Sequence, residues 1–401
     1  MRSVLSPLAH AGFRRLWTGQ AVSSVGDQLS VVAIAALVID AGHGAAGLGI
    51  VLAARTLGLV VMIPAGGVIG DRARRTRVMV AADLVRIVAT VALALLQDAP
   101  VAPYAALALV IGAGEAVSQP AYRALLPTLL PSEELESGNA LTALTQEASF
   151  VVGPALGGLL LATGGISAAL WVDAATFAAS LATLLSIREP ARAVPIETPS
   201  IKADLTEGFR AVVERPWIGL VVAMSTLHLM FAVAPWLVLL PVVAADDLGG
   251  TDVYGWLLAA SGVGAMIGAL VAGRWRPRRA GLVAMLGLLP SGLALLTLIG
   301  PSPVLLVGIA SLIGGLGVSI FDVFWNTGVQ RDVPDRLLAR VFSLDYFGSL
   351  ALMPLGYALT GPAVEAFGRE AVLIFGFAVV VITTLPLLAI DSVRRFSSKP
   401  A

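Results

Sequence analysis

The chain has 401 residues, of which 57% are hydrophobic and 13% are charged, and its formal net charge at pH 7 is +0. A soluble domain carries about 25% charged residues, and a chain as apolar as this one would expose large adhesive patches in water. Composition therefore predicts a protein of the lipid bilayer, and the charge balance gives no bulk attraction to nucleic acid. The absence of cysteine and the three scattered histidines exclude disulfides and thiolate metal sites and favour neither a metal centre nor a cofactor.

Apolar runs recur along the whole chain. A helix needs about 20 mostly apolar residues to cross a bilayer, and twelve segments meet this requirement. They are residues 16–39, 47–69, 78–96, 101–122, 140–162, 168–187, 217–243, 254–273, 281–299, 304–324, 341–364 and 371–390. The sequence therefore predicts an all-α membrane protein with twelve transmembrane helices.

One connection, residues 188–215, is longer and more polar than the others and contains prolines. Within it, residues 201–213 have the pattern of a short amphipathic helix at the membrane surface. We therefore expect an N-terminal six-helix bundle over residues 1–187, a cytoplasmic linker over residues 188–215 and a C-terminal six-helix bundle over residues 216–401.

Positive charge is distributed unequally between the loops of this twelve-helix arrangement. When both termini are placed inside, Arg369 is the one basic residue in an outer loop, and of the 26 lysines and arginines only Arg55 and Arg86 lie within spans. Positive loops resist translocation. The asymmetry predicts a multi-pass protein of the plasma membrane with both termini cytoplasmic.

The two halves also repeat weakly. The offset that places Gly70-Asp71 on Gly273-Arg274 also places Pro131 on Pro334, in the loop after the fourth span of each half. Two parallel six-span repeats with a site at their interface are an architecture of transporters.

Residues 66–77, between the second and third spans, read Gly-Gly-Val-Ile-Gly-Asp-Arg-Ala-Arg-Arg-Thr-Arg. The arginines hold the loop on the cytoplasmic side, and the glycines let two helix ends approach closely. Asp71 contributes little to topology and is able to meet a neighbouring helix end or an arginine. For Arg74 and Arg77, a topology anchor and a gating role stay equally open.

A second motif lies in the fifth span, where residues 153–158 read Gly-Pro-Ala-Leu-Gly-Gly. Pro154 removes a backbone donor and bends the helix. Gly153, Gly157 and Gly158 form a flat face for another helix, with ordinary small-residue packing as the alternative interpretation.

Over essentially its whole length the sequence resembles the major facilitator superfamily, whose signature loop is Gly-x-x-x-Asp-Arg-x-Gly-Arg-Arg. Gly67, Asp71, Arg72 and Arg75 match it, whereas Arg74 stands where glycine is usual. The resemblance implies a gating role for this loop, in which Asp71 latches the second and third spans against the eleventh span when the cytoplasmic side is closed.

The Gly-Pro-x-x-Gly-Gly element resembles the exporter branches of that superfamily. Further details resemble its drug exporters, which include macrolide and siderophore efflux proteins. These details are Phe13-Arg14-Arg15-Leu16-Trp17, Gly26-Asp27, Arg55, Gln119-Pro120-Ala121 and Val333-Pro334-Asp335-Arg336. The resemblance implies proton-coupled efflux of amphiphilic small molecules by alternating access.

Charged residues inside spans cost several kcal/mol unless they are paired or hydrated, so each is a functional candidate. Asp27 and Arg55 lie at similar depth on adjacent spans, and we expect them to pair as either a proton-sensitive switch or a static bridge. Asp83 and Arg86 share a helix face. Glu115 and Glu147 lie at about the depth of Arg86 on neighbouring spans, and two carboxyls that share one arginine cannot both ionise cheaply. The proton-coupling candidates are therefore Asp27, Arg55, Glu115, Glu147 and Arg86.

Aromatic residues are few. Phe231, Trp236, Phe321 and Trp325 are candidates for lining an apolar cavity, and the sequence does not show which way they face. For His228, we favour the interpretation as a hydrogen-bonded helix residue over that as a proton carrier.

The sequence favours a monomeric secondary transporter whose partners are a small molecule, protons and the lipid bilayer. It lacks a Gly-x-x-x-x-Gly-Lys-[Ser/Thr] loop, so ATP does not drive it from this chain, and no nucleophile–base or ligand set in the spans indicates an enzyme. A metabolite uniporter or importer, a lysolipid flippase and a non-transporting receptor remain as alternatives.

Overall fold

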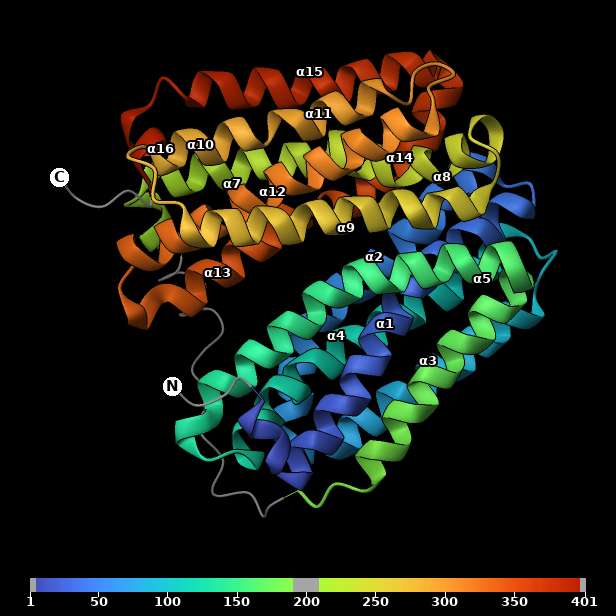
Figure 1. Ribbon diagram of the computed structural model, residues 1–401, viewed down its shortest axis with the longest axis vertical. Coiled ribbons are helices and arrows are strands. Elements are labelled where there is room, and N and C mark those ends of the chain that lie inside the picture. The colour runs from blue at the N-terminus through green and yellow to red at the C-terminus, as the bar shows by residue number, and fades with distance from the viewer. Residues whose placement is uncertain (1–4, 190–208, 397–401) are drawn as a thin grey trace. The chain divides into compact units, whose positions relative to one another are not determined.

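The computed structural model describes residues 5–189 and 209–396, without the side chains of residues 64–72 and of residues 335, 336, 339, 343, 346 and 347. The regular elements in the described ranges are all helical (Figure 1). The helices of the first half are η1 (Ser6–Ala9), α1 (Ala11–Asp40), α2 (Gly44–Arg72), α3 (Arg75–Leu95), α4 (Val101–Leu129), η2 (Ser132–Glu134) and α5 (Leu135–Leu185). Those of the second half are α7 (Pro216–His228), η3 (Leu229–Val233), α8 (Ala234–Asp247), α9 (Thr251–Arg274), α10 (Ala280–Gly287), α11 (Leu289–Leu296), α12 (Val304–Asp332), α13 (Asp335–Leu350), α14 (Met353–Phe367), α15 (Arg369–Leu387) and α16 (Asp391–Arg395).

Ten helices in the described ranges are long and apolar enough to cross a membrane, and Ala280–Leu296 is a shorter apolar helix. The expected all-α fold with apolar helices of membrane-spanning length is thereby confirmed. The predicted number of twelve is not reproduced as twelve separate helices, because the fifth and sixth predicted segments both fall in α5.

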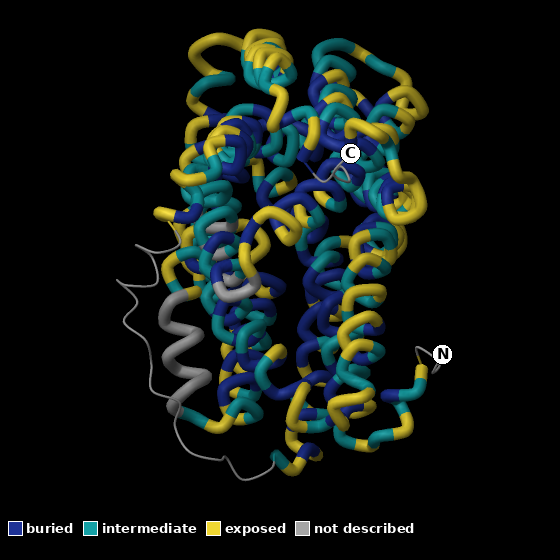
Figure 2. Tube along the Cα trace, turned by 90° about the vertical axis from the view of Figure 1, so that its left-hand side faces the viewer, coloured by how far each residue is buried: buried dark blue, intermediate teal, exposed yellow. Residues whose placement is uncertain are grey.

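The chain divides into two compact units, one formed by residues 1–195 with residues 250–259, and the other by residues 196–249 with residues 260–401. Within the units, buried and exposed positions alternate along most helices (Figure 2). This alternation is expected where each helix turns one face to its own bundle and another away from it.

In the first unit, α5 is a helical hairpin. Its only residue with non-helical dihedral angles is Gly165, at φ 75° and ψ −178°, a region that L side chains rarely adopt. Helix α1 lies between the two arms of α5: Gly157 of the first arm packs on Val32, and Gly26 packs against Thr176 of the second arm. Positive φ at a glycine thus reverses the chain, and α1 holds the two arms together.

The glycines of the Gly-Pro-x-x-Gly-Gly element make close helix contacts. A Cβ atom on Gly153 would lie 2.7 Å from the backbone oxygen of Val25, and a Cβ atom on Gly157 would lie 3.0 Å from the Cβ atom of Val32, both on α1. Gly158 meets the backbone of the first turns of α9, which belong to the same unit. The small residues allow α1 and α5 to approach at a distance that a larger side chain would prevent.

In the second unit, aromatic side chains form one end of the core. The ring of Trp217 stacks on Phe396 with centroids 5.2 Å apart, and Trp325 packs edge-on against Trp217 at 5.6 Å. Farther along the same span, the π-helical turn η3 interrupts the helix between α7 and α8. Pro235, two residues after this turn, cannot donate the usual backbone hydrogen bond, and a local π-helical adjustment is one way in which a membrane helix accommodates that loss.

Candidate functional site

Arg86 of α3 lies at the centre of a buried charged cluster in the first unit. Its side chain is 3% exposed, and its Nη2 atom donates to Oδ1 of Asp27 on α1. Its Nη1 atom is 4.0 Å from Oδ1 of Asp83, one turn earlier on α3. The guanidinium also lies over the ring of Phe177 on α5, 4.0 Å from the ring centroid, where a cation is attracted by the π face.

Small residues on neighbouring helices make room for this cluster. A Cβ atom on Gly114 of α4 would lie 2.8 Å from Cγ of Arg86, so the glycine leaves space for the arginine stem. A Cβ atom on Gly26, next to Asp27, would lie 2.8 Å from Oδ1 of Asp173. Glycine at these two positions therefore allows polar side chains of α1, α3 and α5 to share one buried site.

The cluster holds more carboxyl groups than cations. Asp27, Asp83 and Asp173 are 8%, 2% and 1% exposed, and Asp173 lies within electrostatic range of Arg86. Arg86 Nε and one oxygen each of Asp83 and Asp173 have no hydrogen-bond partner among the described residues. Three buried carboxyls beside Arg86 cannot all ionise cheaply, although Arg55 also lies within electrostatic range of Asp173.

Arg55 takes a different partner from the one that we expected. Its Nη2 atom lies 3.4 Å from Oε2 of Glu115 on α4, whereas Asp27 pairs with Arg86. The expected Asp27–Arg55 pair is therefore not the one in the structure. Counting residues along a helix gives depth but not direction, and Arg55 lies where α2 packs closely on α4, with Gly112 against its backbone oxygen.

The remaining predicted coupling and gating residues are dispersed. Glu147 is exposed on α5, and Arg86 pairs with Asp27 and Asp83 rather than with it. Gly67, Asp71 and Arg72 fall at the end of α2, where side chains lie outside the described part of the structure. Their gating role stays a prediction.

The signature loop has a partner that sequence reasoning missed. The carboxylate of Glu189 accepts hydrogen bonds from the backbone N–H groups of Arg75 and Thr76, both at 3.1 Å, and from the Thr76 hydroxyl at 2.8 Å. A carboxylate at a helix N-terminus satisfies unpaired donors and the helix dipole. The only signal in the sequence was an acidic residue at the start of the polar linker, which specifies no partner.

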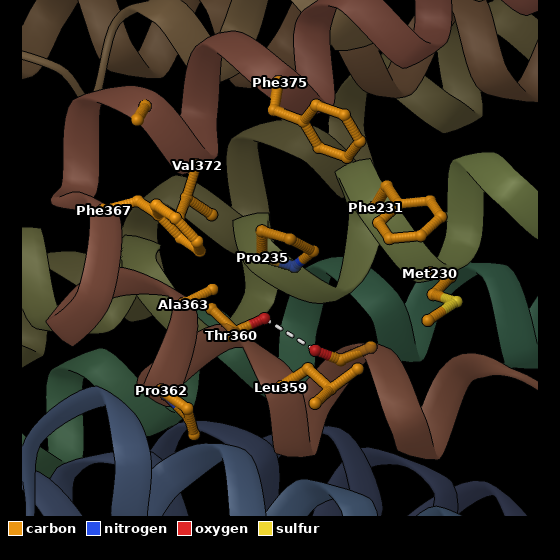
Figure 3. Close-up of a pocket in the computed structure, with 12 residues that line it drawn as sticks. Met230, Phe231, Pro235, Leu359, Thr360, Pro362, Ala363, Phe367, Val372 and Phe375 are labelled. Carbon is orange, nitrogen blue, oxygen red and sulfur yellow. Dashed lines mark hydrogen bonds between the residues drawn. The ribbon is translucent and has the colours of Figure 1, made fainter.

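A largely apolar pocket of about 650 Å³ lies in the second unit between η3, α8, α14 and α15 (Figure 3). At one end, the rings of Phe231 and Phe375 meet edge to face with centroids 5.4 Å apart. Thr360 is the one polar side chain in its lining, and its hydroxyl donates to the backbone oxygen of Gly356 at 2.7 Å. The pocket offers hydrocarbon and aromatic surface to a ligand and no charge.

The predicted cavity residues divide between this pocket and the core. Phe231 lines the pocket, whereas Trp236 does not belong to the lining. Phe321 and Trp325 are 6% and 5% exposed in the aromatic end of the core. His228, just before η3, shares a hydrogen bond of 2.7 Å with the Thr383 hydroxyl, in agreement with its interpretation as a hydrogen-bonded helix residue.

Span-length apolar helices that enclose buried charges and an apolar pocket are features of an integral membrane transporter. Solved structures agree at the level of the fold. The nucleoside transporter NupG matches with a TM-score of 0.74 at 12% identity, over 94% of this chain and 98% of that chain. A bacterial homologue of the human lysosomal transporter Spinster matches with a TM-score of 0.69 at 14% identity, over 98% and 97%.

A major facilitator family model described as "Transmembrane secretion effector" matches residues 2–399, and the chain belongs to this family. The multidrug efflux pump Tap of Mycolicibacterium fortuitum is 29% identical over 93% of this chain and 92% of the relative. The enterobactin exporter EntS of Shigella flexneri is 30% identical over 98% and 94%. These matches confirm the expected superfamily. They also confirm that the chain is an efflux-type transporter and not an enzyme.

Proposed function

We propose that the protein exports an amphiphilic small molecule across the plasma membrane by alternating access and that inward proton flow drives the export. The excess of buried carboxyls around Arg86 carries the proposal, because buried carboxyls that share one cation cannot all stay ionised and one of them readily takes up a proton. Relatives named as a multidrug efflux pump and an enterobactin exporter support export.

The proposed coupling acts through the contact between Asp27 and Arg86. Protonation of Asp27 weakens its ion pair and lets Arg86 turn towards Asp83 or Asp173, which joins α1 to α3 in a different way. A proton shifts the balance between inward-facing and outward-facing states only if it binds one state more tightly. For the exchange to be coupled, the substrate must bind more tightly when the site is deprotonated if the proton favours one facing state, so that proton and substrate stabilise different states.

The apolar pocket of the second unit supports a substrate with a hydrocarbon or aromatic part. Phe231, Phe375 and Phe367 supply ring surface, and a pocket of this size accommodates the apolar body of a drug-sized molecule. The pocket has no charged side chain in its lining, so the polar part of the substrate must be bound elsewhere.

The proposed topology has twelve crossings in two sets of six, with both termini in the cytoplasm and the protein acting as a monomer. A straight helix of 51 residues would extend about 75 Å, more than twice the hydrocarbon thickness of about 30 Å. Division of α5 at Gly165 supplies one crossing beyond the ten candidates, and Ala280–Leu296 supplies another.

Proton coupling is tested in sealed vesicles that hold the purified protein and an internal pH dye. Lipophilic cations, macrolides and siderophore-like compounds are added under an imposed pH gradient. We expect substrate-dependent proton movement that falls to the level of protein-free vesicles in Asp27→Asn and persists in Asp98→Asn, which changes an exposed carboxylate between α3 and α4. Substrate flux without proton movement in the wild type would instead identify a uniporter and reduce the buried cluster to a structural role.

A further inference from the structure

A second pocket, of about 600 Å³, lies in the second unit where α9 ends and α10 begins, against the last turns of α12. Its lining includes three arginines, Arg276, Arg278 and Arg331, and no carboxylate. The side chains that complete it are apolar or aromatic apart from Thr327. The pocket therefore combines the exposed guanidinium groups of Arg276 and Arg278 with apolar surface, unlike the apolar pocket beside Phe231.

The structure positions the first of these arginines. Arg276 Nη1 donates to the backbone oxygens of Ala272, at 3.3 Å, and of Trp275, at 3.0 Å, so the guanidinium stays at the C-terminal end of α9. Arg276 and Arg278 are both exposed, and among the described residues neither of them has a carboxylate partner. Their positive charges are therefore open to an external anion, to which guanidinium groups form charge-assisted hydrogen bonds.

Apolar surface adjoins these guanidinium groups. Trp275 is 46% exposed, Leu270 is 56% exposed and Val271 is 40% exposed, all on or next to the last turns of α9. Tryptophan at the end of an apolar helix is typical of the boundary between hydrocarbon and headgroups. The ligand that satisfies both surfaces has an anionic head and an apolar body.

The position of the pocket along the membrane normal favours a headgroup. Helix α9 ends at this pocket, and the opposite end of the second unit holds Asp246 and Asp247 at the end of α8. The positive end of a membrane protein faces the cytoplasm, whose leaflet carries the anionic lipids. Basic pockets between helices on that side bind phosphate-bearing lipid heads.

We propose that this pocket binds the phosphate group of an anionic phospholipid from the cytoplasmic leaflet. Arg276 and Arg278 hold the phosphodiester, and the acyl chains lie along α9. Guanidinium groups suit this role because they present planar pairs of donors to phosphate oxygens. The assignment is independent of the export proposal, since it concerns neither substrate nor protons.

The test measures binding of fluorescent phosphatidylglycerol to the purified full-length protein in neutral detergent. We expect Arg276→Gln with Arg278→Gln to bind about 30-fold more weakly than the wild type, because the variant removes both guanidinium groups that pair with the negative headgroup. Arg123→Gln, which removes an exposed arginine of the first unit, is the matched control and should bind as the wild type does.

A second variant blocks the space and keeps the charge. Gly273 lines the pocket, and a Cβ atom on it would meet nothing within 4 Å, so the side chain of Gly273→Leu starts in open space at the pocket wall. We expect this variant to keep the thermal stability of the wild type and to lose at least tenfold in affinity for the lipid. Unchanged binding in both variants would overturn the proposal.

Competition distinguishes the two sources of phosphate. Phosphatidylcholine and glycerol phosphate are added separately to the complex with fluorescent phosphatidylglycerol. If neither compound displaces the fluorescent lipid at millimolar concentration, the site recognises the negative headgroup and the acyl chains together, as proposed. Displacement by glycerol phosphate alone would replace the lipid with a free phosphate ester, and displacement by phosphatidylcholine would remove the requirement for negative charge.

Discussion

Arg86 is the central residue of the buried charged cluster in the first unit. Buried beside three carboxyl groups, it offsets charge that would otherwise be unpaired in a low-dielectric interior. Sequence reasoning identified it, together with Asp27 and Asp83, because charges in apolar spans are conspicuous. It did not find the Asp27–Arg86 contact, since the direction in which a side chain leaves its helix depends on packing that one sequence does not reveal.

Removal of this arginine should therefore be severe. We expect Arg86→Gln to lower the free energy of unfolding by about 3–5 kcal/mol, the range for breaking a buried ion pair at one partner. Thermal unfolding in detergent measures this change. The double variant Arg86→Gln with Asp27→Asn should lose less than the two single changes added together, because it removes both charges of the pair; additive losses would contradict the contact.

Among the elements, α5 shows what the sequence could and could not specify. A break was predicted between residues 162 and 168, and the chain turns at Gly165 within that interval. Hydropathy reveals such a break as a gap between apolar runs. It does not reveal that the two arms enclose α1, because that arrangement arises from glycine contacts at Gly26, Gly153 and Gly157.

The turn of α5 gives a prediction at this scale. Gly165→Val should lower the free energy of unfolding by about 1–3 kcal/mol, since a side chain in that backbone region is strained. The comparison is Gly300→Ala, where a Cβ atom meets nothing within 4 Å and φ is not positive. Equal melting temperatures for the two variants in detergent would show that residue 165 tolerates another conformation.

Over the whole molecule, charge asymmetry predicts topology more firmly than any single span does. The absence of cysteine makes a direct measurement simple, because one introduced cysteine is the only thiol. We expect Asp98→Cys to react with a membrane-impermeant maleimide added outside intact cells, and Arg123→Cys to react only after the cells are opened. The reverse pattern would invert the proposed orientation.

The family and the all-helical fold were accessible from the sequence because hydropathy and the signature motifs extend along the entire chain. The Glu189 cap, the apolar pocket beside Phe231 and the cationic pocket beside Arg276 were not accessible. Each of these joins residues that are far apart in the chain through side-chain directions alone.

The π-turn η3 has a consequence for how its span is built. A π-turn contains one residue more than an α-helical turn, so the segments on either side of it are rotated relative to an uninterrupted helix by about 100°. The face that His228 presents to Thr383 is thereby set separately from the face that Pro235 presents to the pocket. The two parts of this membrane segment therefore orient their side chains independently. A single-residue deletion within η3 would remove the rotation between them and leave one continuous helix.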